Sequence, residues 1–247
     1  MPIERDKTTH GVASAFDRTH WSVVLSARNG SAEEATAAME CLCRTYWWPL
    51  YAFVRRRGYQ AHDAQDLTQE FFTHLLAKDF LRTVDRSKGT FRSFLLASLN
   101  NFIAKDWRRA SAQKRGGQFT FISTDAEFAD QQYLQVQATN LSPEQLFDKQ
   151  WATTLLNQAL SRLQEEFVAA GKGARFEALK IFLPGERVSG SYVEVAARLE
   201  TTEGALKMAV SRMRERYGEL LLAEIANTVS SPTEAEEELR ALFAALS

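Results

Sequence analysis

Apolar residues recur at helical spacing through most of the first hundred residues, and this pattern predicts three helices. The first is expected to begin at a capping box that starts with Ser31, to be kinked or split at Pro49 and to end at Gly58. The second, residues 63–78, carries an apolar stripe beside a row of carboxylates, and the third spans residues 90–111.

The pattern weakens between residues 112 and 142, where glycine and polar residues predict a linker. A second helical unit is expected to begin at Ser142-Pro143, and a pair of helices is predicted within residues 191–222. A last helix begins at Ser231, and its expected apolar stripe consists of Leu239, Leu242, Phe243 and Leu246.

We therefore predict an all-α protein with two small helical domains, a linker between them and an amphipathic C-terminal helix. The expected boundaries are 1–30 for an N-terminal segment, 31–111 for the first domain, 112–142 for the linker, 143–228 for the second domain and 229–247 for the acidic C-terminal helix.

Composition supports a soluble, mostly helical protein. The 247 residues are 45% hydrophobic and 25% charged, with only 12 Gly and 5 Pro. No apolar run approaches the roughly 20 residues that span a membrane, and no signal peptide is recognisable, so we expect a cytoplasmic protein without a membrane segment.

The net charge of −1 hides an uneven distribution. Residues 86–115 hold eight basic residues and one acidic residue, whereas residues 229–247 hold four glutamates and one arginine. A strongly basic segment in a nearly neutral chain is compatible with a local nucleic-acid surface.

Residues 191–221 fit a helix-turn-helix. The expected core positions are Tyr192, Val195, Ala196, Leu199, Leu206, Val210 and Met213. Thr202 would cap the second helix, whose outer face carries Glu203, Lys207, Met208, Ser211, Arg212 and Arg214. Cations for phosphates and short polar groups for base edges suit a recognition helix, but a helical hairpin with a basic surface shows the same pattern.

The helix at residues 90–111 interleaves aromatic, amide and basic side chains, a mixture suited to single-stranded DNA. The alternative is that its aromatic residues are core. We expect that alternative for Phe94 and Phe102, and a surface position for Trp107, which lies between basic residues.

Three segments resemble, in order and spacing, the extracytoplasmic-function (ECF) class of RNA polymerase sigma factors. They are LYAFVRRRGYQAHDAQDLTQEFFTHLL, GTFRSFLLASLNNFIAKDWRRA and SYVEVAARLETTEGALKMAVSRMRERYGELL, and the resemblance covers residues 35–111 and 143–222. It implies a non-catalytic initiation factor that needs no metal or cofactor. The implied partners are core RNA polymerase, through its β′ clamp helices and β flap, and promoter DNA; an anti-sigma factor and a Ser/Thr kinase are further candidates.

The resemblance also implies three binding surfaces. Polymerase binding is expected at Asp63, Asp66, Gln69 and Glu70, because carboxylates complement the arginine-rich clamp, although a solvated face with Asp63 as helix cap is an alternative. Binding of the −10 element is expected at Ser87, Lys88, Thr90, Arg92, Asn100, Asn101, Lys105, Trp107, Arg108 and Arg109. Binding of the −35 element is expected at Thr202, Glu203, Lys207, Met208, Ser211, Arg212 and Arg214.

The chain departs from the family pattern at two places. Gln65 stands where the family often has glutamate, and phosphorylation of Thr68 is a hypothesis for restoring charge to that face. Glu200 stands in the helix-turn-helix turn, where a glycine would relieve a positive φ.

The acidic helix at residues 232–246 has two readings. It would either dock on one of the DNA-binding domains and restrain the free protein, or complete the core of the second domain.

Two other functions stay open. A stand-alone helix-turn-helix regulator explains residues 191–221 but neither of the helices at 63–78 and 90–111. A metal enzyme would use Asp63, Asp66, Glu70 and His74, yet no second helix supplies a matching ligand set.

Overall fold

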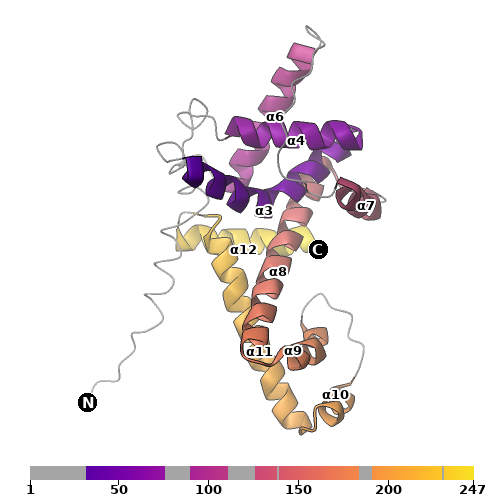
Figure 1. Cartoon of the computed structure of the whole chain (residues 1–247), viewed down its shortest axis with the longest axis vertical. Helices are drawn as coiled ribbons and strands as arrows, with labels where there is room; N and C mark the ends of the chain where they lie inside the picture. The colour runs from indigo at the N-terminus through magenta and orange to yellow at the C-terminus, as the bar shows by residue number, and fades with distance from the viewer. Residues whose placement is uncertain (1–31, 76–89, 111–125, 138, 184–190, 230) are drawn as a thin grey trace, which may run out of the picture. The chain divides into compact units, whose positions relative to one another are not determined.

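The computed structural model describes six stretches of the chain, and every regular element in them is a helix (Figure 1). The stretches are residues 32–75, 90–110, 126–137, 139–183, 191–229 and 231–247. The predicted all-α class is confirmed. The chain divides into two compact units, one made of Met1–Thr154 with Ile225–Ser247 and the other of Leu155–Glu224.

The core of the first unit is built around α3 (Ala32–Arg56). One face of this helix is fully buried, at Leu42, Tyr46, Leu50 and Phe53. The helix continues through Pro49 instead of splitting there, because buried turns on both sides hold it despite the missing backbone donor. It ends as predicted before Gly58, whose φ of +96° suits glycine and whose N–H donates to the Arg55 carbonyl at 3.0 Å.

Helix α4 (Ala61–Leu75) packs against α3 and against α6 (Phe91–Ala110). Aromatic pairs lie where these helices meet: the Tyr46 and Phe91 rings are 5.4 Å apart, and the Phe71 and Phe102 rings are 5.8 Å apart. Phe94 and Phe102 are half-buried and contact core rings, as expected. Because α4 begins at Ala61, Asp63 lies in its first turn and does not cap it.

A further helix, α7 (Ala126–Gln137), lies within the predicted linker and packs against α3 and α4. Arg55 joins it to α3: its Nη2 donates to Asp130 Oδ1 at 2.7 Å, and its guanidinium lies 4.7 Å from the centre of the Tyr133 ring. Arg56 donates to the backbone carbonyl of Gln137 at the end of α7 (3.0 Å) and to those of Thr139 and Leu141 (2.9 Å), which follow the helix. Two arginines therefore bind this part of the linker to the first unit.

The beginning of α8 (Pro143–Ala169) also belongs to the first unit. It starts as predicted, since Gln145 N donates to Ser142 Oγ at 3.1 Å and Ser142 N donates to Gln145 Oε1 at 2.9 Å. Trp48 Nε1 donates to Gln150 Oε1 at 2.7 Å and so connects α3 with α8.

Helix α12 (Pro232–Leu246) returns to the first unit and begins at the predicted cap, Ser231, whose Oγ accepts from Glu234 N at 3.3 Å. Its buried residues are Ala235, Glu238 and Leu242. The predicted apolar stripe is wrong at Phe243, which is 56% exposed. Glu238 takes a core-facing position because Arg92 of α6 forms an ion pair with it there.

The second unit contains the rest of α8 and four shorter elements. These are α9 (Gly173–Leu179), the 3₁₀ turn η2 (Lys180–Phe182), α10 (Tyr192–Arg198) and α11, whose residues Glu203–Ala226 begin in this unit. The predicted core positions Val195, Ala196, Leu206, Val210 and Met213 are buried, and Tyr192 and Leu199 are half-buried. The helix-turn-helix pattern is thus formed by α10 and α11.

The compact units divide the chain differently from the predicted boundaries. Residues 143–154 and 225–247 group with the first unit, whereas the sequence placed them in the second domain and in a separate tail. The physical reason is side-chain pairing between segments far apart in the chain, which helical periodicity does not register. No helix within the described ranges is long and apolar enough to cross a membrane.

Replacing Arg56 with alanine is expected to lower the free energy of unfolding by about 2–3 kcal/mol, because three carbonyls at the end of α7 lose a charged donor. Urea unfolding measures the change, and hydrogen exchange of α7 should accelerate. Arg57→Ala is the matched control, since exposed Arg57 only covers the Phe53 ring at 4.8 Å. An equal loss of unfolding free energy in the two variants would show that the hydrogen bonds of Arg56 do not stabilise this part of the chain.

Candidate functional surfaces

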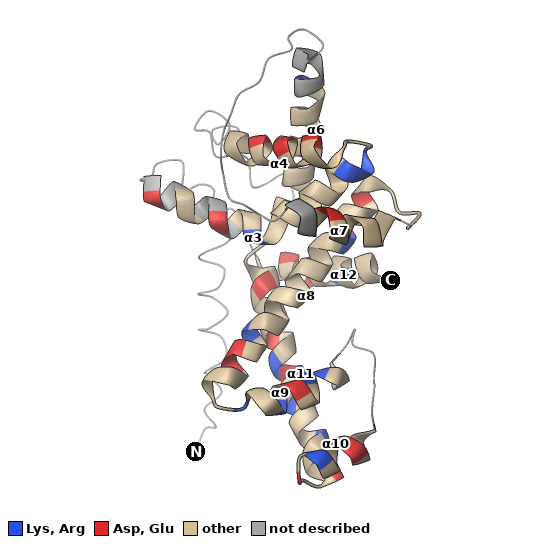
Figure 2. Cartoon of the chain, turned by 45° about the vertical axis from the view of Figure 1, so that its right-hand side comes forward, with Lys and Arg blue, Asp and Glu red and all other residues tan. Residues whose placement is uncertain are grey.

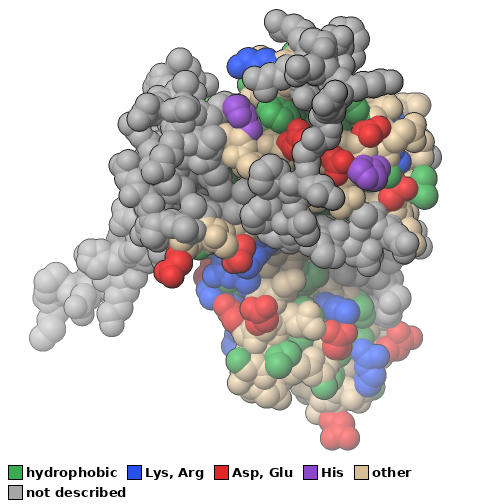
Figure 3. Space-filling model, turned by 45° about the horizontal axis from the view of Figure 1, so that its top comes forward, with side chains coloured by type: hydrophobic (Ala, Val, Ile, Leu, Met, Phe, Trp, Pro, Cys, Tyr) green, Lys and Arg blue, Asp and Glu red, His purple; other side chains and the backbone are tan. Residues whose placement is uncertain are grey.

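The carboxylates of α4 lie on the exposed side of that helix. Asp63, Asp66 and Glu70 are exposed, and Gln65 and Gln69 are half-buried beside them. The opposite side is buried, at Ala64, Leu67, Thr68, Phe71, Phe72 and Leu75. Figure 2 shows acidic positions spaced along the α4 ribbon, and Figure 3 shows acidic and histidine side chains exposed near one another.

Asp66 is paired with a histidine of the same helix. His62 Nδ1 and Asp66 Oδ2 are 3.0 Å apart, one turn from each other, and both side chains are largely exposed. Exposed pairs of this kind contribute little to stability, so a stronger cation can replace the histidine at small cost. The face can therefore offer carboxylate oxygens to arginine side chains of another molecule.

The hypothesis that Thr68 is a phosphorylation site on this face is wrong for the folded chain. The side chain of Thr68 is fully buried, and its hydroxyl donates to the Ala64 carbonyl at 2.7 Å. A kinase cannot reach it, and a phosphate there would place about two negative charges in the core. Thr68 lies on the opposite side of α4 from the carboxylates, so it cannot supply the charge missing at Gln65.

The described residues do not support the metal-enzyme alternative. Among them, no group of three or more His, Cys, Asp or Glu is arranged to hold a metal ion.

The exposed ridge of α6 consists of small and polar residues at four-residue spacing. It runs through Ser93, Ala97, Asn101 and Lys105. Asn101 and Lys105 were predicted DNA contacts, whereas Ser93 and Ala97 were not singled out, although their spacing to Asn101 was readable in the sequence. Thr90 caps the helix, since Ser93 N donates to its Oγ1 at 3.3 Å. Asn100 is half-buried, and its Oδ1 meets no donor in the described part of the chain.

Arg92 does not lie on this ridge. Its side chain is only 14% exposed; Nη2 donates to Glu238 Oε2 at 2.9 Å, and Nη1 donates to Asp148 Oδ1. Its guanidinium also covers the Trp151 ring, 4.5 Å from the centroid. Burial alone would lower the pKa of Arg92, but the Glu238 and Asp148 carboxylates more than offset burial and raise it.

Sequence reasoning missed the three partners of Arg92. The one local signal was a glutamate, Glu238, placed between Ala235 and Leu242 on the inward side of an amphipathic helix. Other predicted −10 contacts are not described: Ser87 and Lys88 lie outside the described residues, as do the side chains of Trp107, Arg108 and Arg109.

The predicted −35 residues are all exposed along the start of α11. These are Thr202, Glu203, Lys207, Met208, Ser211, Arg212 and Arg214. Thr202 also caps the helix, accepting from Ala205 N at 3.2 Å. Lys207 pairs with Glu203 at 2.6 Å, and this hydrogen bond raises the pKa of Lys207.

Two cations farther along α11 are bound to the protein. Arg214 donates to the Phe182 carbonyl from Nε (2.9 Å) and Nη2 (2.6 Å), which secures the end of η2. Arg216 binds both carboxylate oxygens of Glu166 and also Glu219, and its hydrogen bonds lower the pKa of Glu166. Neither guanidinium is as available for DNA as its sequence position suggested.

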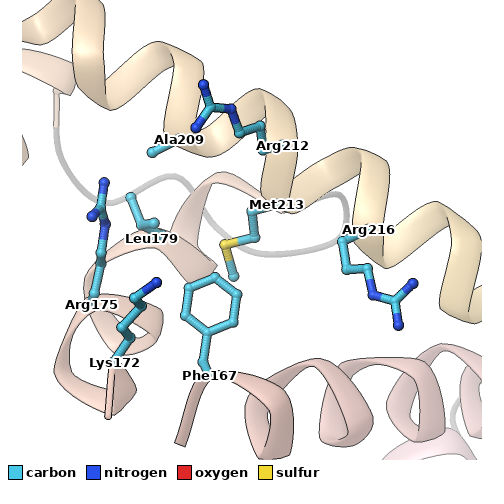
Figure 4. A pocket seen from close by; sticks show the side chains of 8 residues that line it. All are labelled: Phe167, Lys172, Arg175, Leu179, Ala209, Arg212, Met213 and Arg216. Atoms are coloured by element: carbon cyan, nitrogen blue, oxygen red, sulfur yellow. The ribbon is translucent and has the colours of Figure 1, made fainter. Parts of the chain in front are cut away.

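A pocket of about 250 Å³ lies beside this helix in the second unit (Figure 4). Its lining consists of Phe167, Lys172, Arg175, Leu179, Ala209, Arg212, Met213 and Arg216. Figure 4 shows the Arg216 guanidinium directed away from Phe167 and Met213. This guanidinium binds the Glu166 and Glu219 carboxylates. Three other cations at the pocket carry no ion pair within the described chain, so positive charge is available on this side of α11.

The turn between α10 and α11 requires a left-handed residue, and Glu200 supplies it with φ of 51°. Its N–H donates to the Ala197 carbonyl at 3.2 Å, and Thr201 N donates to the Ala196 carbonyl at 3.0 Å. These two bonds form a Schellman motif at the end of α10. Glu200 is at position C′ of this motif, where glycine is usual. The departure from glycine seen in the sequence therefore leaves the turn geometry unchanged, with glutamate carrying the strain.

Comparison with known proteins gives two matches. Residues 43–113 match the Sigma-70 region 2 family, and this stretch contains all of α4 and α6. The chain is also similar to the ECF RNA polymerase sigma factor SigE of Mycolicibacterium smegmatis (strain ATCC 700084 / mc(2)155), with 25% identity over 199 residues that cover 81% of this chain and 67% of that relative. No solved structure matches the chain significantly.

Replacing Glu200 with glycine is expected to stabilise the protein by about 0.5–1 kcal/mol, because glycine adopts a positive φ without strain but loses more entropy on folding. Thermal unfolding measures the gain. Glu215→Gly, at an exposed site inside α11, should instead cost about 1 kcal/mol. A loss of stability in both variants would show that the turn is not strained.

Proposed function

Because the chain belongs to the sigma-70 family and is an ECF-type factor of transcription initiation, we propose that α4 binds core RNA polymerase while α6 and α11 bind promoter DNA. The observation that carries this proposal is the region 2 match over residues 43–113, which includes both α4 and α6. Members of this family are initiation factors without catalytic activity of their own. They work where the polymerase is, in the cytoplasm.

Polymerase binding is proposed on the exposed side of α4, at Asp63, Asp66, Gln69 and Glu70. The β′ clamp helices are the proposed partner, and their arginines would form charge-assisted hydrogen bonds with the carboxylates. The opposite side of α4 is in the core, so the docking face is rigidly held. The β flap is a second proposed contact of the polymerase.

Binding of the −10 element is proposed along the exposed ridge of α6. Asn101 and Lys105 offer amide and cationic groups, and Ser93 and Ala97 leave room for a strand to approach. Ser87, Lys88 and Thr90 are proposed to hold an unstacked base, and Asn100, Trp107, Arg108 and Arg109 the remainder of the element. Arg92 is proposed to join them only after Glu238 no longer occupies its donors.

Binding of the −35 element is proposed for the start of α11. Ser211 and Arg212 are the best placed to contact DNA, because Lys207 is paired with Glu203 and Arg214 with a carbonyl. Thr202, Glu203 and Met208 complete the face. Two weak DNA-binding units on one chain gain affinity when core polymerase holds both at promoter spacing.

Regulation is proposed to act through α12 and not through Thr68. The helix contacts the first unit and contributes a carboxylate to Arg92, a predicted DNA contact. An anti-sigma factor would act on the same surfaces, by covering α4 or α6. A kinase would need a different residue, since Thr68 is buried.

Run-off transcription with purified core polymerase tests the proposal. The full chain should direct specific initiation that core polymerase alone does not give. If the chain binds duplex DNA but neither binds core polymerase nor supports a transcript, it acts as a stand-alone regulator and the proposal fails.

Charge changes on α4 should alter polymerase affinity in opposite directions. Glu70→Arg is expected to weaken core binding about tenfold, equivalent to about 1.4 kcal/mol, and Gln65→Glu to strengthen it by a smaller factor. Glu165→Arg, an exposed reversal on α8 in the second unit, is the matched control. Fluorescence anisotropy with labelled protein measures the affinities, and unchanged binding in Glu70→Arg would remove α4 as the docking face.

A further inference from the structure

Arg92 is enclosed by groups from two other segments of the chain. It lies in the first turn of α6, and its Nε and Nη2 both point to the carboxylate of Glu238 on α12, at 3.4 and 2.9 Å. Its Nη1 donates to Asp148 at the start of α8, and its planar face covers Trp151. All these residues belong to the first compact unit.

The two carboxylates differ in their access to water. The Glu238 side chain is 1% exposed and pairs with Arg92 inside the core, whereas the Asp148 side chain is 38% exposed. A buried carboxylate needs its cation, so Glu238 stays inside only while Arg92 faces it. The position of α12 and the orientation of Arg92 are therefore coupled.

Most apolar side chains of α12 are not fully buried. Only Ala235 and Leu242 are buried with Glu238 among its described side chains, while Glu236, Glu237 and Phe243 are exposed. The helix has its own N-cap at Ser231 and does not need the first unit to satisfy its first turn. Leu239, Ala241, Ala245 and Leu246 are only half-buried. A helix with one buried ion pair and an apolar side that is mostly half-buried can detach without unfolding the core beneath it.

The Glu238 carboxylate that binds Arg92 in this structure resembles a DNA phosphate as a partner for a guanidinium. A guanidinium binds carboxylate and phosphate with the same two-pronged geometry. Arg92 is also on the helix whose exposed ridge is proposed to contact the −10 strand. The carboxylate of Glu238 thus occupies donors that a backbone phosphate would use.

We propose that α12 is a latch on α6, in which Glu238 occupies Arg92 in the free protein and a phosphate of single-stranded promoter DNA displaces it. Asp148 and Trp151 keep the guanidinium in place during the exchange. This inference rests on the proposed function, since it names the regulation of the same DNA surface. The free chain then binds DNA weakly, and binding to DNA releases α12.

The test measures binding of the full chain to a short labelled single-stranded oligonucleotide of mixed sequence, by fluorescence anisotropy. Glu238→Gln keeps the shape of the side chain but removes the charge, and should raise affinity about five- to tenfold, the lower range for coupling between competing sites. Glu237→Gln removes the same charge from an exposed position of the same helix and should change affinity less than about twofold.

The double variant Arg92→Gln with Glu238→Gln separates the latch from a general charge effect. If the latch is correct, the gain from Glu238→Gln disappears when Arg92 is absent. A gain of equal size in the Arg92→Gln background would overturn it, as would a Glu238→Gln protein that melts earlier but binds DNA like the wild type.

A measurement on the wild type covers the case in which Glu238→Gln does not fold. Hydrogen exchange of α12 should accelerate when the chain is saturated with the oligonucleotide, and unchanged protection would overturn the latch. Failure of the proposed function would give a different result: neither the wild type nor the variants would bind core polymerase or DNA.

Discussion

Three arginines turned inward hold the first unit together. Arg55, Arg56 and Arg92 reach partners that lie 56 to 146 positions away along the chain. Each guanidinium, once taken out of water, needs several acceptors, and the segments that supply them are fixed in place as a result. Removing one such segment would leave a charge in the core without its partner. The linker helix α7, the start of α8 and α12 are parts of one body for this reason, and the start of α8 adds the buried apolar residues Leu146, Phe147 and Trp151.

The sequence was sufficient wherever local pattern determines structure. Helical periodicity and capping residues located α6, α12 and the starts of α8 and α11 to within a residue or two, and Thr202 and Ser231 cap as expected. The sequence also indicated where the turn before α11 needs a left-handed residue, because glycine is common at the position that Glu200 occupies. The acidic face of α4 also followed from spacing alone, since residues three and four apart share a side of a helix.

The remainder depends on contacts between distant segments. Nothing near Arg92 in the sequence distinguishes it from the exposed Lys105, and only Glu238 and Asp148 turn it inward. Thr68 lies two residues after the exposed Asp66, but its position falls on the core side of α4, where its hydroxyl can donate to the carbonyl one turn back. Helical spacing fixes the angle between residues, and the burial of one side is decided by what packs there. In both cases a polar residue was assigned to the surface because its buried partner was out of view.

The order of the segments along the chain has a consequence for synthesis. The second unit is inserted between two pieces of the first, so the ribosome produces α6 long before α12. At roughly 5–20 residues per second, the 146 positions between Arg92 and Glu238 take roughly 7–30 s to translate. During that interval the nascent chain displays an arginine without its final carboxylate. A message cut short before α12 would yield a factor that never acquires it.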